Sequence, residues 1–207
     1  ISEDLESREF YCDVIMDEAG KMNKLVRNLL TLNQLESGRD EMTVERFDIV
    51  SVIRGVLQSM DIMIQQKEAK VSFNADKPVY VWADEFKIEE VVTNYTSNAL
   101  NHLDGEKEIE IRVMTEENHV KVTVFNTGDK IPEEDLTRIW GRFYKVDDSR
   151  NRENSGSGIG LSIVRAIQNN YQNEYGVQNL YNGVEFYFDT EVTDLRPVED
   201  GWEIRTS

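Results

Sequence analysis

Three alternate glycines near residue 160 have the spacing of a phosphate-binding turn. Gly156, Gly158 and Gly160 lead directly into an apolar segment that begins at Leu161 and is expected to be a helix. The start of a helix presents free backbone N–H groups and the positive end of the helix dipole, and glycine lets the backbone approach an anion closely. The pattern does not follow a strand, and the chain contains no G-x-x-x-x-G-K-[ST], H-R-D or D-F-G motif. This argues against a Rossmann site, a P-loop and a Ser/Thr/Tyr-type protein kinase.

A stripe of three asparagines is the second group that could do chemistry. Asn94, Asn98 and Asn101 are spaced to share one face of a helix. Asparagine is a mediocre helix former, so three in one stripe need a reason. A side-chain amide oxygen at such a place can coordinate Mg²⁺ as a hard ligand. The alternative is that the stripe is the polar edge of a half-buried helix.

A long irregular segment, residues 127–157, separates these two groups. Loops of this length in a compact domain are usually lids or binding loops. Between Arg138 and Arg152 it has five basic and two acidic side chains, whereas the whole chain has a net charge of −17. This local reversal of sign favours an anionic ligand or an acidic partner. A solvated loop whose basic residues pair with the acidic body explains the charge equally well.

The composition narrows the class of protein. A net charge of −17 argues against binding to nucleic acid or to an anionic membrane surface. The single cysteine, Cys12, excludes a disulfide framework or a cysteine-based zinc site within one chain, and it fits a reducing cytoplasm. No stretch approaches the roughly 18 apolar residues of a membrane helix. The chain begins at Ile1 without a methionine, so we expect a fragment of a longer protein.

The elements that must position these residues fall into two parts. In residues 1–38, apolar side chains recur at heptad spacing and then widen into a leucine-rich face, which predicts one long helix of a bundle or coiled coil. An amphipathic helix packed on its own domain is the alternative. Residues 42–192 mix helix and strand patterns with an antiparallel hairpin, which predicts an α+β fold, a two-layer α/β sandwich with a mixed, mostly antiparallel sheet. The tail, residues 193–207, matches no pattern. Expected strands are 43–47, 71–73, 79–82, 109–113, 120–124 and 184–188, and expected helices begin after Asp48, after Asp84, near Glu133 and at Leu161.

Four motifs, in order along the chain, together resemble the N, G1, F and G2 boxes of the histidine-kinase catalytic domain, the Bergerat or GHKL fold. The motifs are Asn94-Tyr95-Thr96-Ser97-Asn98-Ala99-Leu100-Asn101-His102, Asn126-Thr127-Gly128, Arg142-Phe143-Tyr144-Lys145-Val146-Asp147 and Gly156-Ser157-Gly158-Ile159-Gly160-Leu161. The resemblance covers about residues 1–190, and residues 1–38 resemble the second helix of that family's dimerisation hairpin. Asn126-Thr127-Gly128 and Tyr175-Gly176-Val177 further resemble Gram-positive sensor kinases of the vancomycin-resistance type.

The resemblance implies a site for ATP and Mg²⁺. Asn98 would be the Mg²⁺ ligand, with Asn94 beside it supporting the phosphates, and His102 would lie near the adenine. Asn126 stands where the family usually has the aspartate that accepts a hydrogen bond from the adenine amino group, and Lys130 replaces the second glycine of that box. Because an amide oxygen accepts a neutral rather than a charge-assisted hydrogen bond, weaker nucleotide binding is expected. The same resemblance places Asn101, Gly128, Tyr144 and Leu161 among the nucleotide-binding residues.

The lid would be formed by the basic loop. Phe143 would anchor it, Arg142 and Lys145 would approach the β- and γ-phosphates, and the three glycines would let it fold over them. We expect Asn94, Asn98 and Arg142 to be the catalytic residues. In hydrolysing relatives a glutamate that activates water stands where this chain has Asn94, so the resemblance favours phosphoryl transfer over hydrolysis.

The expected reaction is transfer of the ATP γ-phosphoryl group to a histidine. Neither His102 nor His119 fits the family's H-E-x-[KR]-T-P acceptor pattern, so residues 1–207 are expected to bind nucleotide without autophosphorylating. The implied partners are the phosphoacceptor histidine of the missing dimerisation helix, a response regulator and a second copy of the full-length protein. The implied location is the cytoplasmic part of a membrane sensor. A non-catalytic nucleotide-binding regulatory module and a helical dimer scaffold remain as alternatives.

Overall fold

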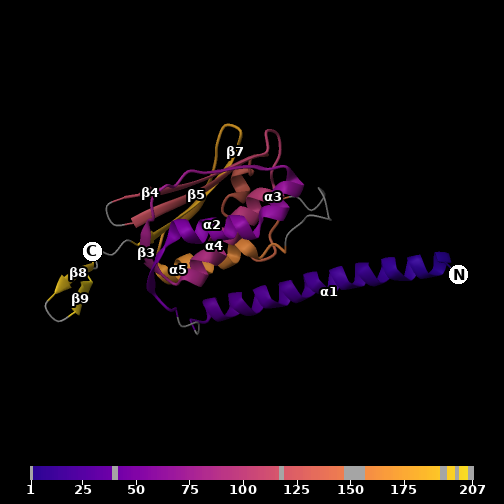
Figure 1. The fold of residues 1–207 in the computed structure, drawn as a ribbon, viewed down its shortest axis with the longest axis horizontal. Helices are drawn as coiled ribbons and strands as arrows, with labels where there is room; N and C mark the ends of the chain where they lie inside the picture. The colour runs from indigo at the N-terminus through magenta and orange to yellow at the C-terminus, as the bar shows by residue number, and fades with distance from the viewer. Residues whose placement is uncertain are drawn as a thin grey trace.

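A computed structural model describes residues 2–38, 42–116, 119–146, 157–191, 195–198 and 201–204 (Figure 1). Its first element, α1 (Ser2–Glu36), is a single helix of 35 residues. The N-terminal part of α1 extends away from the body, and only its last turns pack against it (Figure 1). Leu32 and Leu35 are fully buried there, whereas Ile15 and Met22, two of the apolar residues at heptad spacing, are both 66% exposed. The expected long helix is therefore confirmed, and its leucine-rich face packs on the body.

The body is a two-layer α/β sandwich. Its sheet has the strand order β2-β4-β5-β7-β6, and all neighbours are antiparallel except β2 and β4, which are parallel. The helices lie together on one face of this sheet (Figure 1). The α+β class and the mixed, mostly antiparallel sheet are as predicted. The strands are β2 (Lys70–Phe73), β4 (Glu108–Thr115), β5 (His119–Thr127), β6 (Tyr175–Asn179) and β7 (Gly183–Glu191).

Two helices begin at aspartate caps. The Asp48 carboxylate accepts a hydrogen bond from the Val50 N–H at the start of α2 (Ile49–Ser59), and the Asp84 carboxylate accepts one from the Lys87 N–H at the start of α4 (Glu85–Asn101). Each cap satisfies a backbone donor that the first helical turn leaves free. Both starts were expected from the sequence. The cap of α4 matters most here, because α4 carries the three asparagines.

Several expected boundaries were wrong. The helix after Asp48 is not continuous: it breaks at Met60, and a second helix, α3 (Asp61–Lys67), follows. The helix expected near Glu133 is only a 3₁₀ turn, η1 (Glu133–Asp135). β6 was not predicted. The short strands β1 (Glu45–Asp48) and β3 (Tyr80–Ala83) pair with each other rather than with the main sheet.

The C-terminal tail also contains strands. β8 (Leu195–Val198) and β9 (Gly201–Ile204) form a separate antiparallel pair, which the sequence did not predict. None of the helices in the described part of the chain has the length and apolar character needed to cross a membrane.

Candidate functional site

The asparagine stripe lies along one edge of α4. Asn94, Asn98 and Asn101 are all half-buried. The apolar residues of α4 point into the core and are fully buried; they are Ile88, Val91, Val92, Tyr95, Ala99 and Leu100. The core fixes the rotation of α4, and the stripe therefore borders the surface, where a ligand can reach it.

The cap of α4 also ties this helix to its neighbours. Asp84 is 6% exposed, and its carboxylate accepts hydrogen bonds from the N–H groups of Lys87 (3.2 Å) and Thr43 (3.0 Å). The Asp84 N–H donates to the hydroxyl oxygen of Tyr171 at 2.7 Å. Tyr171 is the last residue of α5 (Gly160–Tyr171), and burial raises the pKa of its hydroxyl to about 12. The two helices that border the site are thus fixed to each other.

Asn94 and Gly160 meet in space although they are far apart in the sequence. A Cβ added to Gly160 would lie 2.6 Å from the Asn94 side-chain oxygen. The Asn94 amide nitrogen donates to the Glu90 carbonyl of its own helix at 2.9 Å, which fixes the direction in which that oxygen points. Gly160 is the first residue of α5. The structure therefore places an amide oxygen from the asparagine stripe at the N-terminus of the helix that follows the glycine turn.

The glycine turn is joined to the lid through Phe143. The Phe143 N–H donates to the Gly158 carbonyl at 2.8 Å, and a Cβ on Gly158 would lie 3.0 Å from the Phe143 backbone. Gly158 has a φ of +69° and Phe143 one of +61°. A left-handed backbone is strained for a bulky residue and is often found at functional sites.

The side chain of Phe143 does not anchor the lid as expected. Its ring is 55% exposed, whereas Trp140 is buried and meets the Tyr175 ring edge-on at 4.9 Å. The Tyr144 hydroxyl donates to the Asp135 carboxylate, and this hydrogen bond raises the pKa of Tyr144. Trp140 and Tyr144 are therefore the side chains that hold the start of the lid. Trp140 was not predicted to have this role, although an isolated tryptophan in a polar loop is a usable signal.

Asn126, His102 and Gly128 converge at the other end of the site. The buried Asn126 amide nitrogen lies 3.1 Å from the Thr127 carbonyl oxygen and 3.4 Å from that of His102. Rotating the amide by 180° would bring its oxygen against these two oxygens, so the side-chain oxygen of Asn126 points elsewhere and stays an acceptor. A Cβ on Gly128 would lie only 2.4 Å from the His102 carbonyl oxygen. The backbone approaches this closely because residue 128 is glycine.

Thr127 and His102 complete this end. The Thr127 hydroxyl donates to the Asp104 carbonyl at 2.8 Å and accepts from the Glu108 N–H at 3.0 Å, so it joins β5 to the loop after α4. The imidazole of His102 has an exposed face, yet the protein atoms around it lower its pKa by desolvation. The ring is therefore neutral at pH 7, which suits contact with an uncharged base.

One basic residue of the lid, Arg142, is placed differently from expectation. The Arg142 guanidinium is ion-paired with the Glu36 carboxylate at the end of α1, and Arg165 of α5 approaches the same carboxylate at 3.9 Å. Arg142 is therefore committed to a carboxylate here rather than directed at a phosphate position. Lys145 is exposed, and Leu161 lies half-buried in the first turn of α5. Gly156 lies outside the described residues.

Comparisons with known proteins identify the family of this chain. Residues 83–193 match the family described as histidine kinase-, DNA gyrase B- and HSP90-like ATPases. The sensor histidine kinase YkoH of Bacillus subtilis is 32% identical over 168 residues, which are 81% of this chain and 36% of YkoH. The chain thus spans about a third of the length of this relative.

Solved structures show the same fold. The catalytic domain of histidine kinase ThkA has a TM-score of 0.64 and 29% identity, covering 72% of this chain and 98% of that one. ThkA in complex with the response regulator protein TrrA has a TM-score of 0.69 at 22% identity, covering 87% and 50%. Full-length ShkA in complex with AMPPNP has a TM-score of 0.77 at 22% identity, covering 88% and 38%. The chain belongs to the histidine kinase-, DNA gyrase B- and HSP90-like ATPase family and contains the ATP-binding catalytic domain of a sensor histidine kinase.

Proposed function

We propose that this domain binds ATP together with Mg²⁺ and transfers the γ-phosphoryl group to a histidine outside residues 1–207, for relay to a response regulator. The observation that carries the proposal is the contact between Asn94 and Gly160. It joins the asparagine stripe, with its oxygen ligands, to the N-terminus of α5, where phosphate is favoured. The stripe and the glycine turn thereby form one phosphate end of a site.

The donor set fits Mg²⁺. Mg²⁺ usually keeps several waters and takes only one or two protein ligands besides the phosphates of its substrate. Over the described ranges, no three histidine, cysteine or carboxylate side chains are grouped to hold a metal by themselves. The half-buried Asn98, one turn after Asn94 on α4, would hold the ion through its side-chain oxygen. When bound, Mg²⁺ would neutralise charge on the phosphate oxygens.

Transfer to an imidazole is favoured over hydrolysis. An acceptor nitrogen would attack the γ-phosphorus, the bond from that phosphorus to the bridging oxygen of ADP would break, and the imidazole proton would leave to solvent. Asn94 is a neutral amide whose nitrogen already donates to Glu90, so it cannot act as the base that activates water. The chain's contribution is positioning and charge stabilisation, on which phosphoryl transfer mainly depends.

The adenine would bind between His102 and Asn126. The Asn126 side-chain oxygen can accept from the adenine amino group, as a neutral hydrogen bond of about 0.5–1.5 kcal/mol instead of about 1.5–3 kcal/mol for a carboxylate. We further propose that Asn101, Gly128, Tyr144, Gly156, Gly158 and Leu161 border the nucleotide. Asn101 belongs to the asparagine stripe of α4 and Leu161 to the first turn of α5, which supports this proposal; Gly156 lies outside the described residues.

Arg142 would exchange partners when nucleotide binds. Its pairing with Glu36 is partly exposed, and such surface pairs are worth little, so a triphosphate could draw the guanidinium away from α1. Lys145 would act beside it. We also propose a domain division at residues 1–38, 42–192 and 193–207, a homodimer in the full-length protein and a place on the cytoplasmic side of a membrane sensor. The relatives described above give no support to the vancomycin-resistance subtype, which stays a prediction.

The test is phosphorylation of a protein that contains the acceptor. The parent protein, or this chain with its preceding segment restored, is incubated with γ-labelled ATP and Mg²⁺. The proposal expects an acid-labile, alkali-stable phosphate that is absent in the Asn98→Ala variant. ATP binding without any such phosphate would favour the second candidate, a nucleotide-binding regulatory module, which the departures at Asn126 and Lys130 support.

A further inference from the structure

The edge strand β6 holds the segment that leads from Gly128 to the lid. In the main sheet, β6 lies at the end of the strand order and pairs with β7. Tyr175 and Asn179 stand on the same face of β6, because alternate residues of a strand point the same way. Tyr175 meets Trp140, and Asn179 meets Ile131. The two ends of one short strand therefore fix the two ends of residues 131–140.

Asn179 grips the backbone of Ile131 at two points. The Asn179 side-chain oxygen accepts from the Ile131 N–H at 2.9 Å, and its amide nitrogen donates to the Ile131 carbonyl at 2.7 Å. Donor faces acceptor in both bonds, so the orientation of the amide is fixed by its surroundings. Ile131 lies beyond the end of β5, and the Asn179 side chain provides the two backbone hydrogen bonds that a neighbouring strand would otherwise make with it.

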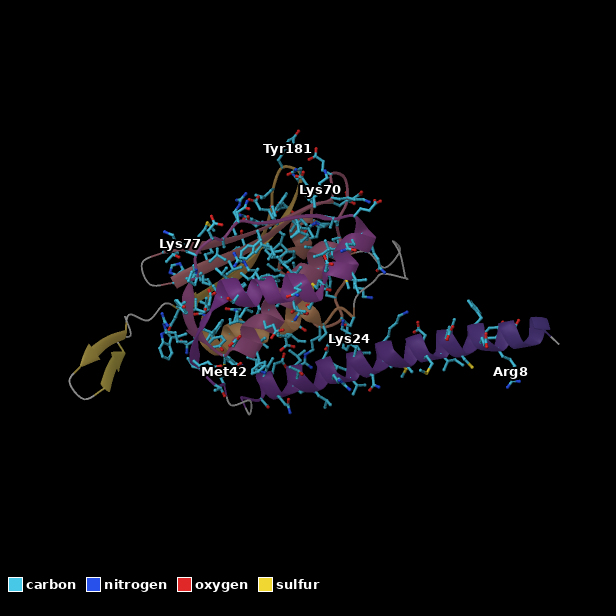
Figure 2. The ribbon with its side chains drawn as sticks, viewed as in Figure 1. Arg8, Lys24, Met42, Lys70, Lys77 and Tyr181 are labelled. Atoms are coloured by element: carbon cyan, nitrogen blue, oxygen red, sulfur yellow. The ribbon has the colours of Figure 1, made fainter. Side chains whose placement is uncertain are left out.

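β6 and β7 form an antiparallel hairpin, and the loop of this hairpin contacts the turn that begins at Gly128. The Gly128 N–H donates to the Asn182 carbonyl at 3.2 Å. Tyr181, at the tip of the hairpin, is 96% exposed and projects away from the body (Figure 2). The hairpin therefore contacts the turn through the Asn182 backbone and the Asn179 side chain. Lys130 lies within the turn so held, at the place where the family's G1 box has its second glycine.

We propose that Asn179 is a positioning residue for the adenine end of the site; this inference rests on the proposed function. By holding Ile131, it fixes the turn that begins at Gly128. Gly128 in turn lies against the His102 carbonyl and the Asn126 amide, with its ideal Cβ position 2.4 Å and 3.3 Å from them. Asn179 therefore sets the direction of the Asn126 acceptor without touching the nucleotide.

The test compares nucleotides that differ at one group of the base. ATP carries the 6-amino group that Asn126 would accept from, and inosine triphosphate carries an oxygen there. Dissociation constants of both, with Mg²⁺, are measured for the wild type and for Asn179→Ala, Asn179→Asp and Asn182→Ala. Asn179→Asp keeps an acceptor for the Ile131 N–H but cannot donate to its carbonyl. Asn182→Ala is the matched control, because Asn182 uses its backbone carbonyl.

The expected result is a loss of selectivity. Both Asn179 variants should bind ATP about tenfold more weakly, as loss of neutral hydrogen bonds predicts. Their binding of inosine triphosphate should hardly change, so the preference for ATP falls by the same factor. Asn182→Ala should match the wild type. Hydrogen exchange should show the Ile131 amide losing protection in Asn179→Ala while the Val122 amide, in the middle of β5, keeps its own.

Three results would overturn this inference alone. Unchanged ATP binding in both Asn179 variants would show that the turn does not depend on this side chain. An equal loss for both nucleotides would show a general structural role instead of a positioning one. An Ile131 amide that exchanges freely in the wild type would contradict the grip itself, whether or not the variants fold. A wild type that binds neither nucleotide would instead refute the proposed function, and this inference with it.

Discussion

Replacing Gly128 by alanine tests the close approach at the adenine end. The added Cβ would lie 2.4 Å from the His102 carbonyl oxygen, which is backbone and cannot rotate away like a side chain. Overpacking of this kind costs about 1–3 kcal/mol. The positive φ of Gly128, +156°, adds a strain of about 1–2 kcal/mol for a residue with a side chain. We expect Gly128→Ala to lower the free energy of unfolding by about 2–5 kcal/mol.

Gly105→Ala is the matched control. Gly105 also has a positive φ, +65°, but a Cβ there would meet no atom within 4 Å. It should therefore show the strain alone, about 1–2 kcal/mol. Urea unfolding followed by far-ultraviolet circular dichroism gives both values. If Gly128→Ala proved no more destabilising than Gly105→Ala, the contact between Gly128 and His102 would not exist as described, and the account of the adenine end would fail.

Two further substitutions test other parts of the molecule. Gly55→Ala, at an exposed position inside α2 with no atom within 4 Å of the added Cβ, should raise the free energy of unfolding by about 0.5–1 kcal/mol; a loss of stability in urea unfolding would contradict the helix geometry there. Tyr171→Phe should cost about 0.5–1.5 kcal/mol at pH 7, because the buried Asp84 N–H loses its acceptor. The folded pKa of Tyr171, about 12, lies above its ordinary value of 10, so this hydroxyl stabilises the fold fully below pH 10 and loses that effect as pH rises towards 12. Between pH 10 and 12, the phenylalanine variant should therefore lose stability less steeply than the wild type. Part of the slope remains in the variant, because burial also raises the pKa of Tyr95. Equal slopes in the two proteins would show that Tyr171 is not protected from ionisation.

The sequence predicted those parts of the fold that depend on local patterns. Caps at Asp48 and Asp84 marked two helix starts, and alternating apolar residues marked β4, β5 and β7. The sequence did not predict the elements whose structure depends on tertiary contacts. β6 is short and contains Gly176, and its pairing with β7 is what makes it a strand. No glycine or proline lies at the break between α2 and α3 at Met60, so the local sequence did not predict this break.

In the functional site, too, the sequence predicted the features that depend on local patterns and not those that depend on tertiary contacts. The spacing of Asn94 and Asn98, and of the glycines, was visible in the sequence because each set lies on one element. The contacts between elements were not visible. The ion pair of Arg142 with Glu36 and the hydrogen bonds of Asn179 with Ile131 join segments that are distant in the chain. A contact between two single, distant residues produces no periodic pattern in the sequence, so it could not be predicted.

Binding of ATP with and without Mg²⁺ tests whether Asn98 holds the metal ion at a nucleotide site. Isothermal calorimetry on the wild type and on Asn98→Ala would be run in Mg²⁺ and again in excess chelator. The wild type should bind ATP more tightly when Mg²⁺ is present, and Asn98→Ala should lose this difference while its thermal unfolding is unchanged. No binding heat in the wild type at millimolar ATP would show that the domain has no ATP site, and an equal effect of Mg²⁺ in both proteins would show that Asn98 does not hold the metal ion.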